Sequence, residues 1–152
     1  YVRSAVTKGS LRAYSEVQAC DVYIICVPTP LCENVEIATP NIEYVKDAAH
    51  GIAAHIKKGD IVILESTSPV GTTEVVQEIL QNNGIDISEI FLAYCPERVL
   101  PGKIMSELVE NDRIVGGINA KSSSEVASFY RTFVKGNVFE TEAKVAEMCK
   151  LT

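Results

Sequence analysis

Short apolar runs alternate with amphipathic segments along this chain, and this alternation restricts the folds that it can adopt. The run at 21–28 is continuous and rich in β-branched residues, and further strands are expected at 60–67, 90–95 and 112–117, with a last short one at 137–141. Runs that are apolar throughout are typical of strands buried on both faces. Strands that alternate with helices of this length predict an α/β fold, in which helices cover both faces of a parallel sheet.

The helices between these strands carry recognisable start and stop signals. Thr39 is expected to cap a helix that has Pro40 at its first position and ends at Gly59. Ser122 and Glu125 form an S-x-x-E pattern, which predicts a capping box at the start of a later helix. Two further helices are expected at 72–82 and from about 143 onward.

Charge and hydropathy exclude two classes of partner. The net charge of the 152 residues is −6, whereas nucleic-acid binding needs clustered lysine and arginine. The longest apolar run, 22–27, is far too short to span a bilayer. We therefore expect neither a nucleic-acid partner nor a membrane.

The cysteines and histidines do not form a recognisable metal or disulfide pattern. The five cysteines are an odd number and contain no C-x-x-C pair, which indicates reduced thiols in a cytoplasmic protein. His50 and His55 stand five residues apart on an expected helix, so they face different directions and no metal site is predicted.

Both ends of the sequence interrupt a pattern. Tyr1 has no helix or strand start signal before it, and Leu151 and Thr152 fall within an expected helix. We expect the chain to be a piece of a longer protein.

Three polar loops follow the first three expected strands, at 27–30, 65–73 and 95–102. In a parallel sheet these loops meet at one edge, where open α/β sheets bind ligands. Any one of them is also explained as a solvated turn or a helix cap, so for the three together both interpretations stay open.

Within the first two loops, threonines are the candidate ligand contacts. Thr29 lies between two prolines, which stiffen its backbone, and Thr67 follows Ser66 at the tip of a strand. After Gly71 a helix is expected to begin, and its free N–H groups would favour an anion or sugar hydroxyls.

The third loop and the last helix provide the charged candidates. Glu97 is a candidate general base or water-positioning carboxylate, with a pKa set by Arg98 and by burial. Arg98 is alternatively a clamp for a phosphate or carboxylate. Lys150 shares a helix face with small residues and either points into a cleft or is a solvated helix lysine, whereas the mid-helix Cys149 is expected to be inert packing.

No established phosphate-binding or nucleophile motif occurs in the chain: G-x-G-x-x-G, the Walker A loop and G-x-S-x-G are all absent. The loops are informative in combination, in the order CVPTP, ESTSPVGTT, AYCPERVLPGK, NDRIVGG and AEMCKLT. Together they resemble the UDP-glucose/GDP-mannose dehydrogenase family, over essentially the whole chain. CPERVLPG with AEMCKLT is most similar to the branch that acts on UDP-N-acetyl-D-mannosamine.

The resemblance implies a Rossmann-like fold, NAD as cofactor, a UDP-sugar as substrate and a homo-oligomeric parent enzyme. Members oxidise the C6 alcohol of a nucleotide sugar to a carboxylate, through an aldehyde and a thioester held on a cysteine. It assigns Thr29 and Thr67 to NAD contacts, with Thr67 also near the reacting centre. Glu97 matches the carboxylate that assists thioester hydrolysis.

The remaining matched positions are Arg98 and Val99, which the resemblance assigns to the nucleotide sugar, and Lys150, which it assigns to the substrate oxyanion. The family's Gly-rich turn and G-G-S-C segment do not occur in these residues. We therefore expect residues 1–142 to be the latter part of the NAD-binding domain, residues 143–152 to start a linking helix, and the piece alone to be inactive. The open alternatives are a UDP-glucose or GDP-mannose 6-dehydrogenase and a non-catalytic nucleotide-binding module.

Overall fold

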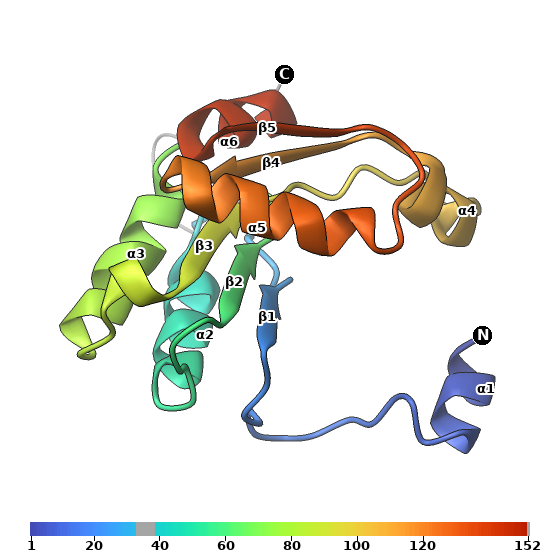
Figure 1. Ribbon diagram of the computed structural model, residues 1–152, viewed down its shortest axis with the longest axis horizontal. Helices are drawn as coiled ribbons and strands as arrows, with labels where there is room; N and C mark the ends of the chain where they lie inside the picture. The colour runs from blue at the N-terminus through green and yellow to red at the C-terminus, as the bar shows by residue number, and fades with distance from the viewer. Residues whose placement is uncertain (33–38, 152) are drawn as a thin grey trace.

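A computed structural model describes residues 1–32 and 39–151 of the chain; Thr152, the last residue of the expected linking helix, lies outside the described residues. Its centre is a five-stranded sheet with strand order β1-β2-β3-β4-β5 (Figure 1). The strands are β1 (Val22–Ile25), β2 (Ile61–Leu64), β3 (Phe91–Tyr94), β4 (Arg113–Gly117) and β5 (Val138–Glu142). β1 to β4 lie within the expected strands, and β5 ends one residue beyond the last expected strand.

Helices cover both faces of the sheet, which confirms the predicted α/β class. The helices are α1 (Val2–Thr7), α2 (Glu43–Ala53), α3 (Thr72–Asn82), α4 (Ile104–Glu110), α5 (Ala120–Arg131) and α6 (Ala143–Leu151), with a short 3-10 turn η1 (Ile87–Glu89). α2, α3 and α6 pack on one face and α5 packs on the other. The helix α1 lies apart from the sheet in Figure 1 and buries no residue.

The strands bury alternate residues on the two faces, as the pleat requires. Val62 and Leu64 of β2 belong to the core beneath α2 and α3, whereas Ile63 between them packs toward α5. On β4, a Cβ at Gly116 would lie 2.6 Å from the Cβ of Ala146. Glycine at that position therefore allows α6 to lie directly on the sheet.

The expectation of a parallel sheet needs one correction. β1, β2 and β3 are parallel to one another, and β4 is parallel to β5, but β3 and β4 pair antiparallel, with Tyr94 opposite Gly116. The amino end of β4 therefore lies at the carboxyl edge of β1–β3. Arg113, the first residue of β4, is placed at that edge for this reason.

Two predicted helix caps are wrong. α2 begins at Glu43, not at Pro40, because Pro40 forms an isolated antiparallel bridge with Leu31 and Asn41 Oδ1 accepts the Glu43 N–H at 2.9 Å. α5 is capped by Asn119, whose Oδ1 accepts from the backbone N–H of Ser122 at 2.8 Å. The helix cap is therefore Asn119, and the predicted capping box of Ser122 and Glu125 does not form the start of α5.

Across residues 1–32 and 39–151, no helix combines the length and apolar character needed to cross a membrane.

α6 starts at Ala143 as expected, and Ala146 is fully buried against the sheet. The division of the chain into domains at residue 142 stays a prediction.

Candidate active site at the carboxyl edge of the first three strands

The loops after β1 and β2 are joined directly by hydrogen bonds. The Thr29 hydroxyl donates to the backbone carbonyl of Thr67 at 2.5 Å. Below it, the Ser66 hydroxyl donates to the Val27 carbonyl at 2.7 Å. Thr29 and Thr67 therefore lie together at one edge of the sheet, with the Thr67 side chain exposed.

A cavity of about 810 Å³ opens beside this pair and collects most of the predicted site residues. Its lining includes Thr67, Glu97, Arg98, Val99 and Lys150, with Glu65, Leu100, Ile114 and Cys149 completing it. These residues come from the loop after β2, the loop after β3, the start of β4 and the end of α6. Thr29 is outside the lining and reaches the cavity only through Thr67.

Glu97 is held from two sides, and its charged partner is not the predicted one. Arg113 Nη1 donates to Glu97 Oε2 at 3.0 Å, and the backbone N–H of Arg98 donates to Oε1 at 2.6 Å. The expected side-chain pair with Arg98 is replaced, because the antiparallel β4 brings Arg113 underneath the loop. The hydrogen bond and charge of Glu97 outweigh burial and keep the pKa of Arg113 above its ordinary value.

The side chains of Lys150 and Arg98 cross between the third loop and α6. Lys150 is half-buried, and its ammonium donates to the backbone carbonyl of Glu97 at 2.5 Å. The Arg98 guanidinium is exposed and donates through Nη2 to the carbonyl of Cys149. Lys150 thus lines the cavity and is only partly exposed to solvent.

The amino end of α3 is not free for a ligand, contrary to expectation. Glu147 of α6 is fully buried, and its carboxylate accepts the backbone N–H of Gly71 at 2.6 Å and that of Thr73 at 2.8 Å. The Thr73 hydroxyl donates to the same carboxylate at 2.7 Å. A carboxylate from α6 thus occupies the position where an anion was expected.

Buried polar side chains lie next to Glu65, which lines the cavity. The Tyr130 hydroxyl donates to Glu65 Oε1, and the Arg113 guanidinium carbon lies 5.6 Å from the centre of the Tyr130 ring. Burial, together with the charges of Cys95 and Glu65, raises the pKa of Tyr130 well above its ordinary value. Burial likewise raises the pKa of Cys95 to about 12, so this thiol stays protonated and unreactive.

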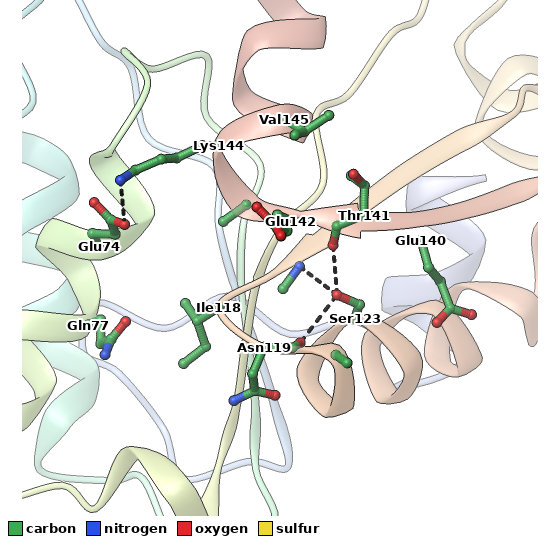
Figure 2. A pocket seen from close by; sticks show the side chains of 13 residues that line it. Glu74, Gln77, Ile118, Asn119, Ser123, Glu140, Thr141, Glu142, Lys144 and Val145 are labelled. Atoms are coloured by element: carbon green, nitrogen blue, oxygen red, sulfur yellow. Dashed lines mark hydrogen bonds and ion pairs between the residues drawn. The ribbon is translucent and has the colours of Figure 1, made fainter.

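A second hollow, of about 740 Å³, lies where β4 and β5 end and α5 and α6 begin (Figure 2). Glu74, Glu140 and Glu142 line it, and Lys144 closes one side through a 2.8 Å ion pair with Glu74. The excess of carboxylates disfavours an anionic nucleotide there. None of the predicted site residues lines it.

Within the described part of the chain, no group of three or more His, Cys, Asp or Glu side chains is arranged to hold a metal ion. The site residues that sequence reasoning missed are Arg113 and Glu147. Their segments, NDRIVGG and AEMCKLT, belong to the recognised motifs, but neither spacing nor periodicity indicates a partner for them.

Comparison with known proteins shows the family of this chain. The model of the UDP-glucose/GDP-mannose dehydrogenase family, NAD binding domain, matches residues 1–134. The chain belongs to this family.

Relatives within the UDP-glucose/GDP-mannose dehydrogenase family are similar over the whole chain. An NDP-N-acetyl-D-galactosaminuronic acid dehydrogenase of Ralstonia nicotianae is 46% identical and a UDP-N-acetyl-D-mannosamine dehydrogenase of Yersinia pestis is 45% identical. Each match covers 99% of this chain but 37% of the relative. The solved structure of a UDP-D-ManNAc dehydrogenase from Pyrococcus horikoshii superposes with a TM-score of 0.91 at 38% identity, over 99% of this chain and 36% of that one.

Proposed function

We propose that this chain is the NAD-binding part of an enzyme that oxidises the C6 alcohol of a UDP-acetamido sugar to a carboxylate. The observation that carries the proposal is the cavity at the carboxyl edge of β1–β3. It brings a threonine, a carboxylate, a guanidinium and an ammonium from distant segments to one place. A non-catalytic nucleotide-binding module has no need of that combination.

The residues at this edge fit the neutral, hydroxyl-bearing part of NAD. The exposed Thr67 side chain is available to a ligand, and Thr29, which donates its proton to Thr67, keeps lone pairs that accept. The pyrophosphate does not fit at the amino end of α3, because the Glu147 carboxylate already occupies it. When bound, NAD supplies the hydride acceptor for the oxidation.

In this proposal the charged side chains act on the reacting end of the sugar. The Lys150 ammonium stabilises negative charge as it develops on the C6 oxygen, where a positive group helps the transition state more than the neutral alcohol. Glu97 orients or deprotonates the water that releases the carboxylate product. Arg98 and Val99 contact the nucleotide sugar at the mouth of the cavity.

The proposed substrate is UDP-N-acetyl-D-mannosamine. The CPERVLPG segment and the names of the relatives from Yersinia pestis and Pyrococcus horikoshii support it. The Ralstonia relative, named for N-acetyl-D-galactosaminuronic acid, makes the galacto-configured acetamido sugar the second candidate. A cytoplasmic location and a homo-oligomeric parent enzyme complete the proposal.

NADH formation by the full-length protein tests the proposed function. UDP-N-acetyl-D-mannosamine should be oxidised with the highest kcat/KM among the acetamido sugars, and UDP-glucose and GDP-mannose should serve as poor substrates. Preference for the galacto-configured sugar would select the second candidate. No NADH with any nucleotide sugar would favour the non-catalytic module.

Arg98→Ala in the full-length protein should raise KM for the UDP-sugar more than it lowers kcat. The lost charge-assisted contact is present in both the ground state and the transition state, so its removal weakens binding by about 2 kcal/mol. Steady-state kinetics with NAD saturating measures the effect, and Arg131→Ala, at a surface ion pair with Glu140, is the matched control. An unchanged KM with a collapsed kcat would move Arg98 from binding to chemistry.

A further inference from the structure

Arg113 is a buried cation whose position is difficult to explain by packing alone. Its side chain is 3% exposed, whereas that of its partner Glu97 is 29% exposed and faces the cavity. Its Nε has no hydrogen-bond partner among the described residues. A buried charge with an incomplete set of partners is a costly way to fill a core, because an apolar residue of similar volume is often as stable.

The geometry of the guanidinium fixes the direction in which it acts. Nη2 donates to the Leu108 carbonyl at 3.3 Å, and the guanidinium lies over the Tyr130 ring. These two contacts restrain the position of the guanidinium. Nη1 is left to donate to Glu97 Oε2 at 3.0 Å. With the Arg98 N–H on Oε1, both carboxylate oxygens of Glu97 are held, and the plane of the carboxylate is fixed toward the cavity.

The topology of the sheet supplies this support. Arg113 is the first residue of β4, and only the antiparallel pairing of β3 with β4 brings that end of the strand beneath the loop that carries Glu97. In a wholly parallel sheet, the first residue of β4 would lie at the opposite edge. The reversal of strand direction therefore places a rigid, positively charged group under the carboxylate.

We propose that Arg113 is the positioning residue that holds the Glu97 carboxylate correctly oriented for its part in the reaction. The inference rests on the proposed function, because it assigns Arg113 an effect on turnover through Glu97. Arg113 itself does not line the cavity. It acts through Glu97, its ion-pair partner in the cavity lining.

A double-mutant cycle in the full-length enzyme tests this inference. Arg113→Lys keeps the charge but loses the fixed fork of donors, so kcat should fall about tenfold or more while KM for NAD and for the UDP-sugar stays within about twofold. In a Glu97→Gln background the same change should lower kcat by no more than about twofold, because the carboxylate through which Arg113 acts is gone. The control is Arg131→Lys, which alters an exposed ion pair with Glu140 and should leave the kinetics unchanged.

Equal losses from Arg113→Lys in both backgrounds would show a general structural role and overturn the inference. If Arg113→Lys does not fold, Arg113→Gln with Glu97→Gln removes both charges and leaves no unpaired ion in the core. That double variant should match the kcat of Glu97→Gln alone, and a further loss would also overturn the inference. An inactive wild-type enzyme would overturn the proposed function and this inference with it, whereas an active enzyme with additive losses overturns the inference alone.

Discussion

Lys150→Ala in the full-length protein should lower kcat by about 100-fold or more, the usual effect of removing one group that stabilises an oxyanion. The ammonium lies half-buried at the cavity and donates to the Glu97 carbonyl at 2.5 Å, so this hydrogen bond fixes its position. A charge held in this way interacts more strongly with an alkoxide-like transition state than with the neutral alcohol. Only that difference accelerates the chemical step.

Lys144→Ala is the matched control for this prediction. Lys144 lies on the same helix, but it is exposed and pairs with exposed Glu74, so its loss should leave both kcat and stability nearly unchanged. Affinity for NAD, measured by titration, should be nearly unchanged in both variants. If kcat of Lys150→Ala stays near the wild-type value, Lys150 serves only to hold the Glu97 loop against α6.

The order and type of the central elements are predictable because local signals determine them. Within 60–67 the stretch Ile61–Leu64 is apolar without a break, which a strand buried on both faces requires, and the four-residue β2 forms at those residues. The direction of β4 has no such signal. It is set by the connection from β3, where the short helix α4 buries no residue and so leaves no apolar pattern in the sequence.

The loops of the candidate site were predictable, but the side chains that support them were not. Thr67 and Glu97 follow buried strands, so the sequence itself places them at a sheet edge. Arg113 and Glu147 act on residues that are 16 and more than 70 positions away. Their importance depends on strand direction and on the docking of α6, which are properties of the assembled fold.

Glu147→Ala should destabilise the chain strongly, by about 3 kcal/mol, because it leaves buried donors without an acceptor. The carboxylate is fully buried and joins α6 to the first turn of α3 through the N–H groups of Gly71 and Thr73 and the Thr73 hydroxyl. Its loss removes the cap of α3 and the main polar contact between the two helices. Chemical denaturation of the 152-residue chain, followed by circular dichroism, measures the change in the free energy of unfolding.

Two further variants test whether stability depends on the Glu147 cap of α3 or on any carboxylate near that helix. Glu147→Gln keeps one acceptor oxygen, but its amide NH₂ faces one of the N–H donors of α3. The stability of this variant should therefore be intermediate between the wild type and Glu147→Ala. Glu74→Ala removes an exposed carboxylate from α3 itself and should cost less than about 1 kcal/mol. Equal stability of Glu147→Ala and Glu74→Ala would mean that water replaces the Glu147 carboxylate at the amino end of α3. In that case α6 would be held by the apolar contact of Ala146 with the sheet, and the position of Lys150 at the cavity would not depend on the cap.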